Sequence, residues 1–375
     1  MIDLKETRDR IDDVDKEIAA LFEKRMRLVE KIAEYKKENH MDVVDAEREE
    51  EMIRDLRKMA SSEFNSIGIR DLMQQIISIS RKRQYQIQTA YDVDPQLDFE
   101  EIDVIYKDKR VVFQGVEGAY SYAAMYKYFG KDVKSSNART FKDALDAIIK
   151  KKADFAVLPI ENSTAGIVTD MYDLLMDYDI SIVDEQTVKI EHNLVGLEET
   201  DFSKIKTVYS HPQALAQCKV FLDNHPEWEI KEYSNTAAAA KKVMEDKDPT
   251  QVAISSQYAA EIFNLKILRK NIFFDPYNTT RFVIVSRNKM FRSEANRVSI
   301  CFDLKHSSGS LYNILSHIMY NGLNMTMIES RPIPNSPWEY RFFIDFEGNL
   351  KDAAVKNALL GIRQDANYMR ILGNY

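Results

Sequence analysis

Between residues 11 and 35 the sequence repeats apolar side chains at alternating spacings of three and four residues. This spacing predicts one long helix with a single apolar face. About 30 residues of helix span roughly 45 Å, which is more than a helical domain of this size can cover by itself. We therefore expect a second copy of the chain to cover the stripe, whose members are Ile11, Val14, Ile18, Leu21, Leu28, Ile32 and Tyr35.

Two further helices are predicted nearby, from about Ala46 to Met59 and from about Ser66 to Ile87. Polar residues interrupt the apolar stripes: Arg25 lies within the first, and Ser80 and Gln84 lie within the third. Buried polar groups are unfavourable unless a partner satisfies them. Two explanations remain open, namely a ligand site and a coiled-coil interface in which a few polar residues set the register.

The polar residues make residues 1–90 resemble the all-helical chorismate mutase domain. Each polar position of that family's active site has a counterpart here: Arg8, Arg25, Lys36, Asp45, Arg48, Glu49, Ser80 and Gln84. The resemblance implies that chorismate is rearranged to prephenate without a cofactor or a covalent intermediate. Holding a compact conformer and stabilising the charge that develops on the ether oxygen would supply the rate.

The resemblance also assigns a role to several of these side chains. Arg8 and Arg25 would hold the two carboxylates, which suits the paired N–H groups of a guanidinium. Lys36 and Gln84 would hydrogen-bond the breaking ether oxygen, and Glu49 would take the ring hydroxyl.

The spacing of the two arginines predicts that two chains build this site. Arg8 and Arg25 are seventeen residues apart, which is about 25 Å along a helix axis. One arginine side chain reaches only about 6–7 Å, so a straight helix cannot direct both at one small molecule. We therefore predict an intertwined dimer in which Arg8 comes from the antiparallel first helix of the second chain.

Residues 91–108 are rich in acidic residues and are expected to form a linker, and residues 109–290 then alternate short apolar runs with helical patterns. The alternation predicts an α/β domain with a largely parallel sheet. Its predicted helices are Tyr122–Phe129, Phe141–Ile149, Ile167–Met176, Gln213–Leu222 and Thr236–Met244.

The segment Val157–Val168 is expected to place a polar turn, Glu161–Gly166, between a buried strand and the helix that begins at Ile167. Free N–H groups and the helix dipole would favour an anion in such a turn. An ordinary helix cap would have the same pattern.

Three more polar segments lie at strand ends: Gly115–Ser121, Ser210–Gln213 and Asn278–Phe282. Each has an ordinary explanation when taken alone, as a turn, a structural histidine or a hydrogen-bonded turn. Several such segments at one crevice indicate a ligand site instead.

Together with Val157–Gly166, these segments resemble the prephenate dehydratase domain. The resemblance implies two α/β lobes like those of periplasmic ligand-binding proteins, with the site between them. It implies that prephenate loses water and carbon dioxide to give phenylpyruvate. Thr280 would be the essential hydroxyl that hydrogen-bonds the departing OH, with full proton transfer left open. The substrate-binding candidates are Asn162, Ser163, Thr164, His211, Gln213 and Arg281.

Residues 295–375 show the order βαββαβ of a ferredoxin-like α+β domain. The segment Glu329–Pro332 and the glycine-led turn before Met325 resemble the phenylalanine-binding ACT domain. The effector-binding candidates are Gly309, Ser310, Leu311, Asn324, Glu329 and Ser330, where Ser310 replaces the family's usual alanine. A dimerisation module without a ligand remains the alternative.

Composition excludes several classes of function. The net charge of −8 disfavours nucleic acid and anionic membranes as partners. Two cysteines, Cys218 and Cys301, suit a reducing cytoplasm, and the charged N-terminus lacks the apolar core of a signal peptide. No metal or other cofactor is expected. The sequence thus predicts a multidomain, cytoplasmic, bifunctional enzyme that is inhibited by L-phenylalanine and forms at least a homodimer. The alternative is a phenylalanine-responsive binding protein with one or both catalytic sites inactive.

Overall fold

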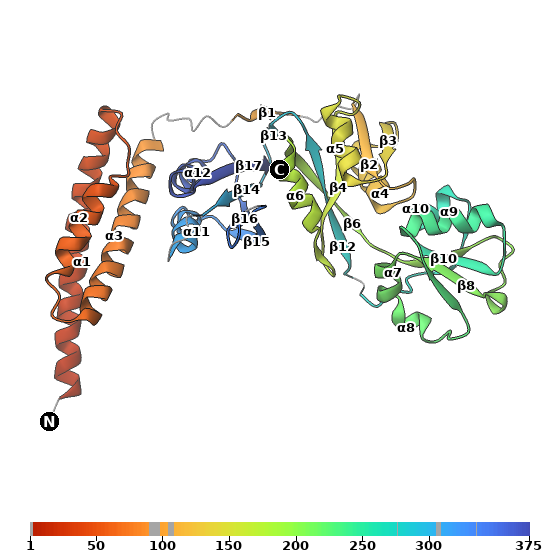
Figure 1. Cartoon of the computed structure of the whole chain (residues 1–375), viewed down its shortest axis with the longest axis horizontal. Coiled ribbons are helices and arrows are strands. Elements are labelled where there is room, and N and C mark those ends of the chain that lie inside the picture. The colour runs from red at the N-terminus through yellow and green to blue at the C-terminus, as the bar shows by residue number, and fades with distance from the viewer. Residues whose placement is uncertain (1–2, 90–97, 104–108, 276, 305–308, 335) are drawn as a thin grey trace. The chain divides into compact units, whose positions relative to one another are not determined.

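The computed structural model describes residues 3–89, 98–103, 109–275, 277–304, 309–334 and 336–375, and it divides into two compact units (Figure 1). The first unit comprises Met1–Leu97 and Asn296–Ile371, and the second comprises Asp98–Ala295 and Leu372–Tyr375. Most of the expected linker, residues 91–108, lies outside the described residues. Its described part contains β1 (Glu100–Ile102), which pairs in parallel with β13 (Met290–Arg292).

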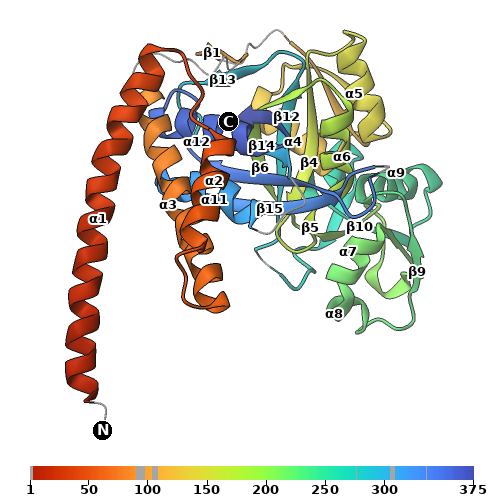
Figure 2. The ribbon, with the colours of Figure 1, turned by 60° about the vertical axis from the view of Figure 1, so that its left-hand side comes forward.

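The N-terminal segment of the first unit is helical, as the sequence predicts. Its helices are α1 (Leu4–Glu38), α2 (Ala46–Arg57) and α3 (Glu63–Thr89). The Asp3 carboxylate caps α1 by accepting from two backbone N–H groups. Every described residue from Asp3 to Ala20 is exposed, because α1 diverges from α2 and α3 towards its N-terminus and its N-terminal end extends beyond them (Figure 2).

The C-terminal segment of the first unit follows the βαββαβ order expected from the sequence. Its elements are β14 (Arg297–Asp303), α11 (Ser310–Tyr320), β15 (Met325–Pro332), β16 (Tyr340–Glu347), α12 (Ala353–Asp365) and the start of β17 (Tyr368–Asn374), whose residues from Leu372 belong to the second unit. The strands lie in the order β15-β16-β14-β17, with β15 at the edge. Helices α11 and α12 cover one face of these strands (Figure 1), and α3 packs against α12.

The first lobe of the second unit contains a sheet of order β6-β12-β4-β2-β3. Its main elements are β2 (Arg110–Gln114), α4 (Tyr120–Phe129), β3 (Lys134–Ala138), α5 (Phe141–Ile149), β4 (Phe155–Asn162), β5 (Gly166–Ile167), α6 (Thr169–Asp177), β6 (Ser181–Lys189) and β12 (Thr279–Ser286). The core between helix α4 and the sheet includes Phe113, Met125, Val157 and Ile284.

The second lobe contains a sheet of order β11-β7-β10-β8-β9. Its elements are β7 (Asn193–Gly196), η1 (Phe202–Lys204), β8 (Thr207–Ser210), α7 (Pro212–Gln217), α8 (Lys219–Leu222), β9 (Glu229–Glu232), α9 (Thr236–Asp246), β10 (Gln251–Ser255), α10 (Gln257–Ile262) and β11 (Lys266–Arg269). The chain enters this lobe between β6 and β7 and returns between β11 and β12.

Each sheet is largely parallel in strand direction, as predicted, because four of its five strands run the same way and one runs against them. Strand β12 is antiparallel to both β4 and β6, and β7 is antiparallel to β10 and β11. The reason is that β7 and β12 follow the two crossings between the lobes. Helical crossovers within one sheet, which enforce parallel pairing, connect other strands.

The predicted bounds of two helices were wrong. The turn after β4 leads into β5, which folds back on β4 as a hairpin, so the following helix begins only at Thr169. The turn is therefore not a helix N-terminus. The single helix expected over Gln213–Leu222 is divided at Cys218 into α7 and α8. No helix in the described part of the chain is long and apolar enough to cross a membrane.

Candidate functional sites

A cavity of about 360 Å³, here called the interlobe cleft, lies between the two lobes of the second unit. The first residues of α4, α7 and α9 line it, as do the ends of β4 and β12. Gly118 brings the loop before α4 close to the second lobe: a Cβ there would lie 2.8 Å from the Cα of Ala259. Its φ of +85° is also one that side-chain-bearing residues rarely adopt. The sequence thus allows the lobes to meet closely beside the cleft.

The cleft is polar but carries no permanently charged side chain. None of the described residues that line it is Lys, Arg, Asp or Glu. Burial lowers the pKa of both His192 and His211, so both imidazoles are neutral at neutral pH. Helices α4 and α9 begin at the cleft, and their free N–H groups and dipoles favour an anion there. The cleft can therefore hold a negatively charged ligand with neutral donors.

Thr280 and Asn162 lie opposite each other on β12 and β4, and both line the cleft. The Oδ1 atom of Asn162 accepts from the backbone N–H groups of Thr164 and Ala165, which fixes the orientation of its amide. Its Nδ2 then donates to Thr280 Oγ1 at 2.9 Å. Because Thr280 Oγ1 is an acceptor in this bond, its own proton is free to be donated elsewhere.

The structure brings four of the seven dehydration candidates into the cleft: Asn162, Thr280, His211 and Gln213. His211 begins α7, where its Nδ1 accepts from the Gln213 N–H at 3.3 Å. Ser163 and Thr164 do not line the cleft. Their hydroxyls hold the segment before β12 instead: Ser163 Oγ accepts from Thr279 N–H at 2.9 Å, and Thr164 Oγ1 donates to Asp275 at 2.9 Å.

Arg281, a third substrate-binding candidate, does not line the cleft either. Side chains alternate between the faces of a strand, so Arg281 points away from the face that Thr280 and Phe282 share. There it forms ion pairs with Glu161 at 3.0 Å and Glu185 at 3.2 Å. The period-two alternation of β12 is visible in the sequence and already predicts that Arg281 and Thr280 lie on opposite faces.

Sequence reasoning missed other polar residues that line the cleft. Asn278 and Gln217 are hydrogen-bonded to each other, and His192 forms a hydrogen bond with Gln217. Gln217 lies one helical turn after Gln213, and Asn278 opens the segment already identified, so both positions carried a weak signal. His192 lies in the crossing between β6 and β7, where nothing in the local pattern distinguishes it.

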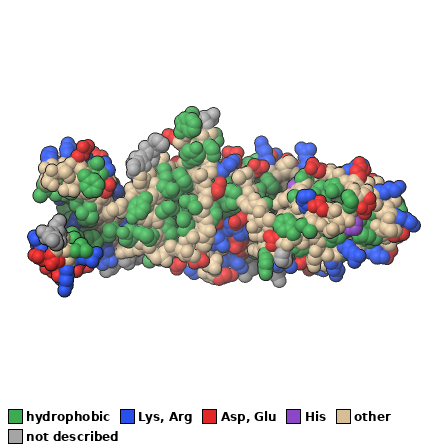
Figure 3. All heavy atoms as spheres, turned by 90° about the horizontal axis from the view of Figure 1, so that it is seen from below, with side chains coloured by type: hydrophobic (Ala, Val, Ile, Leu, Met, Phe, Trp, Pro, Cys, Tyr) green, Lys and Arg blue, Asp and Glu red, His purple; other side chains and the backbone are tan. Residues whose placement is uncertain are grey.

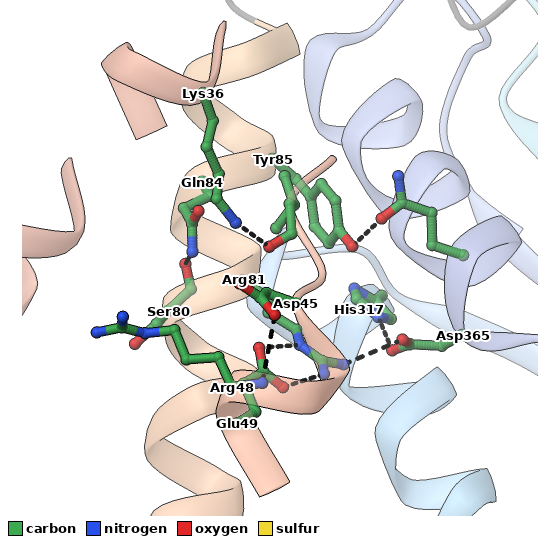
Figure 4. Close-up of polar contacts among 12 residues, drawn as sticks. Lys36, Asp45, Arg48, Glu49, Ser80, Arg81, Gln84, Tyr85, His317 and Asp365 are labelled. Carbon is green, nitrogen blue, oxygen red and sulfur yellow. Dashed lines mark hydrogen bonds and ion pairs between the residues drawn. The ribbon is translucent and has the colours of Figure 1, made fainter. Parts of the chain in front are cut away.

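On the N-terminal helices the structure gathers only part of the expected site (Figure 4). Arg25 donates to the hydroxyl of Ser80, and burial lowers the pKa of Arg25 while the nearby charge of Glu49 opposes that shift. Lys36 donates to the Val43 carbonyl at 2.7 Å. Asp45 caps α2 at the backbone N–H of Arg48, whose side chain is exposed. Gln84 is buried, and among the described residues its Oε1 has no hydrogen-bond partner.

Glu49 is engaged by a residue that the sequence did not single out. Arg81 on α3 contacts both carboxylate oxygens of Glu49, with Nε donating to Oε1 at 3.1 Å. Burial acts to lower the pKa of Arg81, but the hydrogen bond and charge of Glu49 outweigh it and raise that pKa. The Arg81 Nη1 atom also lies 3.5 Å from Asp365 at the end of α12, and Asp365 binds His317 at 2.8 Å (Figure 4).

Arg8 is not brought to this cluster. It lies in the exposed N-terminal half of α1, about 25 Å along the helix axis from Arg25. The apolar stripe around it is uncovered: Ile11 is 54% exposed and Leu21 is 64% exposed. Hydrophobic side chains are visible on the surface at the end of Figure 3 that corresponds to these helices.

The effector candidates are divided between the ends of α11. Gly309, Ser310 and Leu311 begin the helix, whereas Asn324 follows its C-terminal end. Eleven helical residues separate them by about 16 Å. Strand β15 runs back along the helix, and Glu329 and Ser330 lie in its second half. One pocket, of about 640 Å³, includes Gly309, and another, of about 520 Å³, includes Asn324.

Comparison with known proteins accounts for both halves of this arrangement. The family model of type II chorismate mutase matches residues 7–85, and that of prephenate dehydratase matches residues 111–290. A bifunctional chorismate mutase/prephenate dehydratase of Buchnera aphidicola subsp. Acyrthosiphon pisum is 34% identical over 375 residues, covering 98% of this chain and 95% of the relative.

Two solved structures each match 71% of this chain, with a TM-score of 0.66. One is a prephenate dehydratase from Arthrobacter aurescens in complex with L-Phe, 32% identical, with 89% of that chain covered. The other, described as a novel type of quorum quenching acylase, is 30% identical, with 97% of that chain covered. The full-length similarity together with both family matches decides the assignment: the chain belongs to the family of bifunctional chorismate mutase/prephenate dehydratases.

Proposed function

We propose that the interlobe cleft is the site where prephenate is dehydrated and that Thr280 assists the departure of its hydroxyl group. The observation that carries this proposal is the hydrogen bond from Asn162 Nδ2 to Thr280 Oγ1. It uses the acceptor capacity of the threonine and leaves its proton to be donated to the leaving oxygen. Threonine is too weak an acid to be ionised here, so hydrogen-bond donation is its role, and the gain of aromaticity drives the loss of carbon dioxide.

The two carboxylates of prephenate would be held without a cation. The beginnings of α4 and α9 offer backbone N–H groups and the positive ends of helix dipoles. Ser121, Gln213 and Thr236 add polar side chains beside these termini. Neutral donors are well suited to a carboxylate that must leave as carbon dioxide, because a strong ion pair would stabilise the ground state.

We propose that the mutase site combines two chains, with Arg25, Lys36, Asp45, Arg48, Glu49, Ser80 and Gln84 from one and Arg8 from the other. The uncovered stripe of α1 supports this arrangement. Burying one such side chain is worth about 1.5–3 kcal/mol, so several half-exposed residues provide a strong drive for association. An antiparallel first helix from a second copy would cover the stripe and deliver Arg8 to the cluster.

We propose that residues 295–375 form an ACT domain that binds L-phenylalanine and inhibits the enzyme. The observed strand order and the L-Phe complex of the Arthrobacter relative support this role. The separation of Gly309 from Asn324 favours an effector site shared between two copies. Inhibition then requires two states of the protein that differ in their affinity for phenylalanine.

The domain division that follows is a mutase segment of residues 1–90, a linker of 91–108, a dehydratase of 109–290 and the regulatory segment from 295. The competing function is a phenylalanine-responsive binding protein with one or both sites inactive. A coupled assay separates the two. We expect the purified protein to convert chorismate to phenylpyruvate, with L-phenylalanine slowing the conversion. Binding of phenylalanine without formation of phenylpyruvate would favour the competing function.

A further inference from the structure

A chain of hydrogen bonds runs from the cleft to a buried histidine that no role in the reaction yet explains. Its starting point is certain, because backbone N–H groups can only donate. The N–H groups of Thr164 and Ala165 bind Asn162 Oδ1 at 3.1 and 2.8 Å. The other end of the Asn162 amide is therefore the nitrogen, which donates to Asn278 Oδ1 at 2.7 Å.

The same logic orients the next two amides. Because Asn278 Oδ1 accepts from Asn162, the Asn278 nitrogen faces Gln217 and donates to its Oε1 at 3.1 Å. The Gln217 Oε1 atom is thus an acceptor, and its Nε2 lies on the other side of the amide. No residue in the described ranges accepts from that nitrogen, and Gln217 lines the cleft. Its two N–H donors are available to a ligand.

The network continues to His192, whose Nδ1 lies 3.4 Å from the Tyr120 hydroxyl. The contact with Gln217 determines which nitrogen of this imidazole carries the proton. The Nε2 atom of His192 lies 2.8 Å from Gln217 Oε1, which cannot donate, so Nε2 must. His192 is 3% exposed and burial lowers its pKa, so the ring is neutral and Nδ1 is unprotonated. Tyr120 and Phe273 pack edge-on around the ring and hold its plane.

We propose that His192 is a positioning residue for prephenate dehydration: its Nε2–H holds Gln217 Oε1 so that the Gln217 amide nitrogen donates into the cleft. The inference rests on the proposed location of the dehydration site. His192 comes from the crossing into the second lobe, Gln217 from α7 and Asn278 from the crossing back. Gln217 is therefore bound to both segments that join the lobes, to one by His192 and to the other by Asn278.

Two amide variants test the proposal. In His192→Gln the amide reaches the position of Nε2 and restores the donor, whereas in His192→Asn the shorter side chain reaches only the position of Nδ1. Both lose the ring, so both share its packing defect. We expect the dehydratase kcat/KM of H192Q to stay within about threefold of the parent and that of H192N to fall by roughly tenfold, the effect of one lost hydrogen bond. The circular dichroism spectrum and thermal midpoint of each variant report whether the unit that carries His192 is folded.

A H192Q activity less than about threefold above that of H192N would overturn the proposal, whether both variants are active or both are impaired. Should the variants fold poorly, the parent protein gives a second test. Its ¹⁵N-histidine NMR spectrum should contain a neutral histidine protonated at Nε2, assigned to His192 through the contacts of its ring with Tyr120 and Phe273. Protonation of that residue at Nδ1 would overturn the proposal. Full dehydratase activity in Thr280→Val would instead contradict the location of the site, so the two failures are distinguishable.

Discussion

The interlobe cleft and the polar cluster on α1–α3 differ in how much of a site one chain supplies. The cleft takes side chains from both lobes of the same chain, and Asn278 and Thr280 within it are almost fully buried. The helical cluster has Arg25 and Ser80 in contact but leaves Arg8 exposed on an uncovered half-helix. Two lobes of one chain can enclose a ligand, whereas the exposed half of α1 leaves an apolar stripe that we propose a second chain covers.

The largest expected effect is a loss of dehydratase activity that leaves the mutase activity intact. Thr280→Val keeps the side-chain shape but removes the hydroxyl, and we expect dehydratase kcat to fall by about 10²–10³-fold, as for other lost transition-state donors. Mutase activity should remain within about twofold of the parent, since Thr280 lies in the other unit. Thr279→Val is the matched control, because the Thr279 hydroxyl donates to the Tyr277 carbonyl rather than lining the cleft. Equal dehydratase rates in the two variants would contradict the role of Thr280.

Complementation between chains tests the shared mutase site. We expect Arg8→Ala and Arg25→Ala each to lack mutase activity as homodimers. After subunit exchange at equal concentrations, about half of the dimers are mixed and one of their two sites contains neither substitution. Mutase activity should therefore recover to about a quarter of the parent value. Absence of recovery despite exchange demonstrated by mass spectrometry would mean that one chain holds both arginines at one site.

Arg81 provides a smaller test of how the helical cluster is held. Arg81→Met removes the partner of both Glu49 carboxylate oxygens, and we expect mutase kcat/KM to fall by about tenfold, with the dehydratase unchanged. Arg83→Met is the control, because Arg83 pairs with Glu30 at the surface, where ion pairs contribute little. If steady-state kinetics show the same change in both variants, Arg81 does not position Glu49.

Phenylalanine inhibition should respond to Glu329. We expect Glu329→Gln to raise the phenylalanine concentration that half-inhibits the dehydratase by roughly tenfold, because a carboxylate–ammonium hydrogen bond would be lost. Glu347→Gln, at the exposed end of β16, is the control. A point substitution is sharper than deletion of residues from 295 onward, which would uncover the α3 surface that packs on α12. An unchanged inhibition curve would place the effector elsewhere.

The smallest effect concerns the contact between α3 and α11. Lys82 lies buried against the ring of Tyr320, and burial lowers the pKa of its ammonium to about 8. The folded state therefore binds fewer protons than the unfolded state between about pH 8 and the ordinary lysine pKa near 10.5, so this residue's contribution to stability rises with pH in that window. We expect Lys82→Met to have the higher thermal midpoint at pH 7, with the difference shrinking by pH 10. A constant difference would contradict the lowered pKa.

The sequence determined the elements and most of the chemistry by itself. Apolar periodicity predicted α1–α3 and the order of the C-terminal segment, and the polar segments that contain Asn162, Thr280, His211 and Gln213 were placed at strand ends. The roles proposed for these four residues came from the resemblance to prephenate dehydratase. Both kinds of information are local, because a helix or strand displays its buried face within a few residues. The prediction that two chains build the mutase site likewise used only the spacing of Arg8 and Arg25 and the rise per residue of a helix.

Only the tertiary structure decided which polar residues meet. Ser163 and Thr164 do not line the cleft, because the turn that contains them joins the two strands of a hairpin. Arg81 reached Glu49, and His192 reached Gln217, through contacts between elements far apart in the sequence. Such contacts depend on the packing of whole helices and on the two crossings between lobes. A local pattern records which face of an element is buried, but it does not record what that face is buried against.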